Sequence, residues 1–137
     1  MMKLHLINAK KYFSETQLET INAFLKFLQK QLPLFKDTHI SFDDARNIKM
    51  TTGTRKPNHR IHVLSGNRLL IDILRTVSHE WVHEYQHQKM ELKDTDQIQD
   101  IGGPEENMAN VLSGIFMKAF VKEFPHHEKS LYHENEI

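Results

Sequence analysis

The chain has 137 residues, of which 39% are hydrophobic and 26% are charged, a balance typical of one soluble globular domain and not of a disordered segment. Its 18 basic and 18 acidic residues cancel, which argues against a nucleic-acid-binding module. The absence of cysteine excludes disulfides, thiolate metal sites and a cysteine nucleophile. Because the chain has 10 histidines, imidazole and carboxylate groups are the transition-metal ligands that it can offer.

The N-terminal segment, residues 1–6, lacks the apolar run of a signal peptide, and no stretch is apolar for long enough to span a membrane. We therefore expect a cytoplasmic protein with no membrane partner. The apolar residues of 4–7 predict a short opening strand.

A first helix is predicted from Ser14, which has the form of an N-cap followed by Gln17 at the third helical position, a capping box. Apolar residues then recur at three- and four-residue steps, which gives one stripe along a helix that stops before Pro33. The stripe consists of Leu18, Ile21, Leu25, Leu28 and Leu32. We expect this helix to support the core.

Residues 38–65 lose the helical period. Polar and apolar residues alternate in 39–42 and again in 59–64, and the segments 51–54 and 56–58 between them have the composition of turns. This pattern predicts two or three antiparallel strands, the last of which is closed by residues 65–67.

Two further helices are predicted. The segment from Arg68 to about Met90 is apolar on all sides at its start, which indicates a buried central helix. Pro104 is suited to the first position of the next helix, which ends before Pro125. Residues 126–137 are polar, and we expect a loose tail. The predicted fold class is α+β: one domain over residues 1–125, with three main helices and a small antiparallel sheet, followed by the tail 126–137.

The central helix contains the segment His79-Glu80-Trp81-Val82-His83. Helical residues four apart stack on one face, so His79 and His83 can present two imidazoles to one metal ion. Glu80 lies beside the first histidine and can reach a water molecule bound to that ion. The spacing therefore predicts a zinc site with His79 and His83 as ligands and Glu80 as the catalytic base.

The third ligand can be narrowed by geometry. His87 lies about 12 Å along the helix axis from His79, too far to share its ion. The position six residues after His83, where a metzincin has its third histidine, is Lys89, and no glycine turn precedes it. The next histidine is His126. The acidic pair Glu105–Glu106 at the start of the third helix remains, and only one of the two should face the metal because neighbours on a helix point about 100° apart.

The motif His79-Glu80-x-x-His83, followed by Glu106-Asn107-Met108-Ala109-Asn110, resembles the gluzincin metallopeptidases, in particular the small single-domain minigluzincins. The matching segments cover roughly residues 69–120. The sequence of residues 102–110 is also similar to that of small peptidase-like proteins of tailed phages. The resemblance implies a zincin-like fold with Glu106 as the third zinc ligand and Glu105 as the fallback. It also implies that Asn110 orients a ligating histidine.

These observations predict zinc-dependent hydrolysis of peptide bonds. Zinc would lower the pKa of its bound water to about 7, and Glu80 would take the proton and deliver it to the leaving amine. Four residues are equal candidates for the oxyanion donor: His62, Tyr85, Tyr132 and His133. By the resemblance, a peptide or protein substrate would lie along an exposed edge strand, expected to be 59–64. The alternative is a non-catalytic, zinc-binding interaction protein, phage or bacterial, that keeps the zincin fold.

Overall fold

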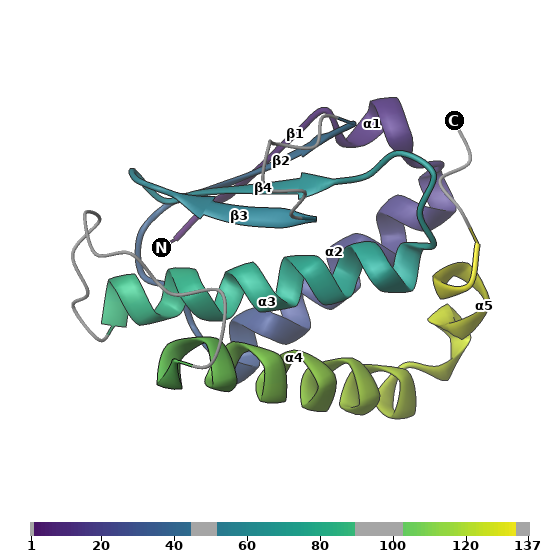
Figure 1. The fold of residues 1–137 in the computed structure, drawn as a ribbon. Helices are drawn as coiled ribbons and strands as arrows, with labels where there is room; N and C mark the ends of the chain where they lie inside the picture. Colours follow the sequence, from purple (N-terminus) through teal and green to yellow (C-terminus); the bar gives the residue numbers. More distant parts are fainter. Residues whose placement is uncertain (1, 45–51, 90–102, 134–137) are drawn as a thin grey trace.

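The computed structural model describes residues 2–44, 52–89 and 103–133. In chain order the elements are β1 (Leu4–Ile7), α1 (Ala9–Tyr12), α2 (Glu15–Gln31), β2 (Thr38–Asp43), β3 (Gly53–Lys56), β4 (Arg60–Leu64), α3 (Leu70–Lys89), α4 (Pro104–Glu123), a 3-10 helix η1 (Pro125–His127) and α5 (Glu128–Leu131). The strands form one layer, α2 and α3 pack beneath it, and α4 lies against α3 on the side away from the sheet (Figure 1). The fold class is α+β, as predicted.

The predicted capping box is present at the start of α2. Ser14 Oγ accepts a hydrogen bond from Gln17 N at 3.2 Å, and Gln17 Oε1 accepts one from Ser14 N at 3.2 Å. The helix ends at Gln31, and Leu32 N still donates to Leu28 O at 2.8 Å before Pro33 prevents continuation. Local signals thus determine both ends of this helix.

The sheet is mixed, and the expectation of an antiparallel sheet is wrong for most of it. The strand order is β1-β2-β4-β3; β1 pairs with β2 and β2 with β4 in parallel, and only β3 pairs with β4 in the antiparallel direction. The helix α2 connects β1 to β2, which is the kind of long crossover that parallel neighbours require. Alternation of polar and apolar residues reports which face is buried and carries no information on strand direction.

The segment around Gly53 was expected to be a turn and is instead the edge strand β3. A Cβ on Gly53 would overlap Thr76 Cγ2 and lie 3.3 Å from Glu80 Cγ. Glycine therefore lets β3 lie directly on α3. Its neighbour β4, which was expected to be the edge, lies between β2 and β3 and is hydrogen-bonded on both sides.

The helix α3 is central, as its apolar start predicted. Leu70, Ile73, Val77 and Trp81 are all 0% exposed, and the Trp81 indole Nε1 donates to Leu32 O at 2.9 Å, which ties α3 to the end of α2. Within the described residues, no helix combines the length and the apolar composition needed to cross a membrane.

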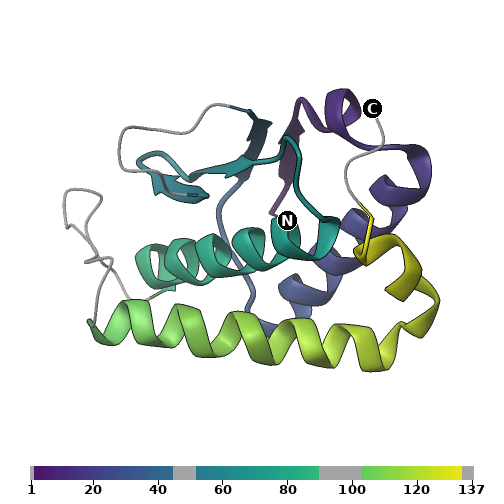
Figure 2. The ribbon, with the colours of Figure 1, turned by 45° about the vertical axis from the view of Figure 1, so that its right-hand side comes forward.

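The expectation of a loose tail is wrong for residues 126–133. The chain turns through η1 into α5 and packs against α2 and α3 at the end of the molecule where α4 finishes (Figure 2). Leu131 is 0% exposed, and Leu70 N donates to His133 O at 2.8 Å. His127 Nδ1 lies 2.7 Å from Thr20 Oγ1. Leu131 is the buried residue of η1 and α5, while residues 134–137 lie outside the described part of the chain.

Candidate metal centre

The helix α3 directs His79 and His83 toward α4. Their Nε2 atoms lie 3.2 Å apart, and the two rings meet edge to face at 76° with centroids 4.8 Å apart. His83 is buried at 5% exposure, while the side chain of His79 is 21% exposed. The pair therefore has one enclosed imidazole and one that solvent can reach.

Glu106 supplies a carboxylate from the opposite side. Pro104 is the first residue of α4, so Glu106 lies in the first turn of that helix. The helix α4 packs against α3. Its Oε1 lies 2.8 Å from His79 Nε2 and its Oε2 lies 3.1 Å from His83 Nε2. In the described part of the chain, His79, His83 and Glu106 form the one group of three metal-ligating side chains whose donor atoms all lie within 4.8 Å of one another.

This donor set fits a zinc ion. Zinc binds imidazole nitrogen at about 2.0–2.1 Å and carboxylate oxygen at about 2.0–2.2 Å, so two ligands of a tetrahedral ion lie about 3.4 Å apart. The two histidine nitrogens lie 3.2 Å apart, close to that spacing, and Glu106 meets them through different oxygens, at 2.8 Å from His79 and 3.1 Å from His83. Two nitrogens and one carboxylate leave a fourth position open, as in catalytic zinc sites.

The neighbouring candidates His87 and Glu105 fall outside the group. His87 is buried on α3, but it lies one turn beyond His83 and is not among the residues whose donor atoms converge. Glu105 is only partly buried, and its donor atoms are not among those that converge. Of the acidic pair, Glu106 is therefore the member that lies in the group, and its role as a zinc ligand stays a prediction.

A buried glutamine that the sequence analysis overlooked orients His83. Gln86 is 0% exposed, and its Oε1 lies 2.9 Å from His83 Nδ1. An amide oxygen only accepts, so this contact favours the tautomer with the proton on Nδ1, in which Nε2 is the atom that can ligate a metal. Gln86 Nε2 also donates to Glu105 O at 2.9 Å, which fixes the start of α4. Its position three residues after His83, within a buried helix, was the available signal.

Asn110 does not have the orienting role that the resemblance implied. It lies on the exposed side of α4, and its carbonyl accepts a hydrogen bond from Ser113 Oγ at 3.1 Å. Because Glu106 faces α3, the residue one turn later at 110 has already rotated by about 40° toward solvent.

Glu80 is buried at 7% exposure, and its Cγ lies near Gly53 of β3. Thr76, Glu80 and Glu84 follow one another at single helical turns and form the face of α3 on which β3 lies. Around the helix, Glu80 is about 100° from His79 and about 60° from His83. Glu80 thus lies between the metal-ligand positions and the β3 side around the helix, and it is not part of the donor group.

The four oxyanion candidates do not gather at this centre. Tyr132 and His133 lie at the start of α3, where His133 O bonds to Leu70, about 14 Å along the axis from His79. His62 is on the sheet face opposite to Ile61 and 3.6 Å from Asp43, and burial, followed by the charge of Lys56, lowers the pKa of its imidazole. Tyr85 packs against the hydrophobic core.

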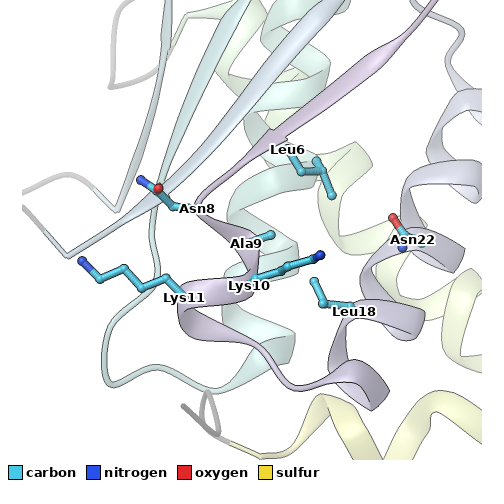
Figure 3. A pocket seen from close by; sticks show the side chains of 7 residues that line it. All are labelled: Leu6, Asn8, Ala9, Lys10, Lys11, Leu18 and Asn22. Carbon is cyan, nitrogen blue, oxygen red and sulfur yellow. The ribbon is translucent and has the colours of Figure 1, made fainter.

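A separate hollow of about 500 Å³ lies at the β1 edge of the sheet, the edge opposite to β3. It is formed by β1, α1 and the start of α2, and its lining residues are Leu6, Asn8, Ala9, Lys10, Lys11, Leu18 and Asn22. In Figure 3, Lys10 extends across it toward Asn22, while Lys11 and Asn8 point away. No member of the metal-ligand group lines it.

Comparison with protein families, with curated proteins and with solved structures finds no match to this chain.

Proposed function

We propose that this protein is a zinc-dependent peptidase with a zincin-like, gluzincin type of site. His79, His83 and Glu106 hold the ion, and Glu80 is the general base. The observation that carries the proposal is the convergence of three ligating side chains from two helices, with a buried carboxylate one residue from the first ligand.

The chemistry divides between the ion and the chain. Bound at these ligands, zinc would supply the Lewis acidity that activates water near neutral pH and polarises the scissile carbonyl. Glu80 accepts the proton of the attacking water and then delivers it to the leaving amine. Gln86 keeps His83 in the tautomer whose Nε2 can ligate.

The substrate is a peptide or protein segment, held on β3 and not on β4. The strand β4 is hydrogen-bonded on both sides, whereas β3 ends the sheet in the described part of the chain. The strand β3 also passes next to Glu80, as the contact at Gly53 shows. An extended peptide that adds to this edge by β-augmentation would bring its backbone to the catalytic carboxylate.

The test is hydrolysis of a library of quenched-fluorescent peptides by the zinc-loaded chain and its variants. Glu80→Gln should keep its zinc and its fold but lose at least about 100-fold in rate, because an amide cannot accept the proton. The control is Asp72→Asn, which makes the same acid-to-amide change in an exposed ion pair with Arg75 on the same helix and should keep the parent rate.

Hydrolysis by Glu80→Gln at the parent rate would contradict the role of Glu80. A parent chain that binds zinc but cleaves no peptide would support the non-catalytic interaction protein instead.

A further inference from the structure

A third buried carboxylate, that of Glu84, lies one residue after His83 and contacts the sheet. The side chain of Glu84 is 0% exposed, and its Oε1 accepts a hydrogen bond from Arg55 Nε at 2.7 Å. The Arg55 side chain, from β3, is only 6% exposed. A buried guanidinium without its counter-ion is strongly unfavourable, so this pair holds β3 and α3 together.

The other oxygen of Glu84 holds the turn between β3 and β4. Glu84 Oε2 lies 2.7 Å from His59 Nδ1 and also accepts from Gln88 Nε2. Asn58 and His59 both have left-handed backbones, with φ of 66° and 59°. Residues other than glycine adopt this conformation at a cost, and the bond from His59 to Glu84 offsets it.

The strand β3 is thus attached to α3 near both of its ends. At the first end, Gly53 allows contact with Thr76 and Glu80, and at the other end Arg55 and His59 bind Glu84. Glu80 and Glu84 are one turn apart, about 6 Å along the helix. The pairing at Glu84 therefore determines how far β3 stands from the proposed base.

We propose that Glu84 is a positioning residue. It holds the edge strand β3 at the distance from α3 at which the backbone of a bound peptide meets Glu80 and the metal ligands. This inference rests on the proposed peptidase function. Loss of the contacts of Glu84 with Arg55 and His59 would move the peptide-binding strand β3 and leave the donor group of His79, His83 and Glu106 intact.

Glu84→Gln tests the proposal, with Asp72→Asn on the same helix as the matched control. The probe is one quenched-fluorescent peptide that the parent cleaves. Glu84→Gln should raise KM about tenfold while kcat per bound zinc stays within about twofold, because binding along the strand is the same in the ground state and in the transition state. A general loss of folded protein would lower the apparent kcat and leave KM unchanged, and that result overturns the proposal.

Backbone hydrogen exchange provides a readout independent of activity. In Glu84→Gln the amides of residues 53–60 should exchange at least about tenfold faster, while those of β1 keep their protection. A parent chain that cleaves no peptide would refute the proposed function. The positioning role of Glu84 is still tested in that case, because unchanged hydrogen-exchange protection of residues 53–60 in Glu84→Gln would overturn that role.

Discussion

Glu106 reaches both histidines at once because its two carboxylate oxygens spread toward His79 and His83 from one position in the first turn of α4. Glu105 has the same chemistry and lies on the neighbouring position, but it points elsewhere around the helix. At the residue scale, the site depends on direction as much as on residue type.

Glu106→Ala should therefore reduce bound zinc from about one ion per chain to a small fraction, since two histidines alone form an incomplete site. Glu105→Ala should keep the parent stoichiometry. Elemental analysis of the two purified variants after dialysis against buffer with a weak chelator measures the difference. Equal zinc in both variants would remove Glu106 from the ligand set.

Gln86 and Asn110 can be compared in the same way. Gln86→Leu should weaken zinc binding about 10- to 100-fold, because His83 loses the acceptor that keeps its proton on Nδ1. Asn110→Leu, on the exposed side of α4, should leave the affinity unchanged. Competition with a zinc-binding dye reports both affinities, and the reverse order would restore Asn110 to the orienting role.

At the scale of the elements, the contact between β3 and α3 connects the sheet to the site. This contact requires a residue without a Cβ at Gly53, whereas a Cβ on Gly114 of α4 would meet nothing within 4 Å. The chain thus offers two glycines that differ in their surroundings and can be changed to the same residue.

Gly53→Ala should destabilise the fold and weaken peptide binding, because the new methyl group pushes β3 away from Thr76 and Glu80. Gly114→Ala should instead stabilise the protein by about 0.5–1 kcal/mol, since alanine is the better helix former and has room. Chemical denaturation of both variants checks the opposite signs. A neutral or stabilising Gly53→Ala would mean that β3 does not lie tightly on α3.

At the scale of the whole molecule, the C-terminal segment closes the end of the helical layer. Leu131 is 0% exposed and His133 O bonds to the first residue of α3, so the core extends into the segment that was expected to be a tail. The folded unit therefore includes η1 and α5 in addition to the preceding elements, β1 to α4, that the structure describes.

Leu131→Ala should lower the free energy of unfolding by about 2–5 kcal/mol, as other buried leucines do when truncated. Tyr132→Ala, at a side chain that is 55% exposed, should change it by less than about 1 kcal/mol. Thermal and denaturant unfolding measure both, and zinc content should remain at the parent level because His79 lies about 14 Å along the axis of α3 from Leu70, where the C-terminal segment docks. Equal stability of the two variants would mean that α5 is not docked.

The helices were predictable because their signals are local. The capping box at Ser14 and the prolines at 33, 104 and 125 bound the long helices α2 and α4, and the three- and four-residue apolar steps identify the buried face of α2. The proximity of His79 and His83 is also a local property, because residues one helical turn apart lie side by side in any helix, independent of the rest of the fold.

Only the tertiary structure decided how these pieces meet. Alternating residues do not encode the direction of a strand, so the parallel pairing of β2 with β4 and the edge position of β3 depend on how α2 and α3 pack beneath the sheet. The selection of Glu106, the use of Gln86 instead of Asn110, and the pairing of Arg55 with Glu84 depend on contacts between elements far apart in sequence. Such contacts are set by the packing of whole faces against one another, and no local pattern records them.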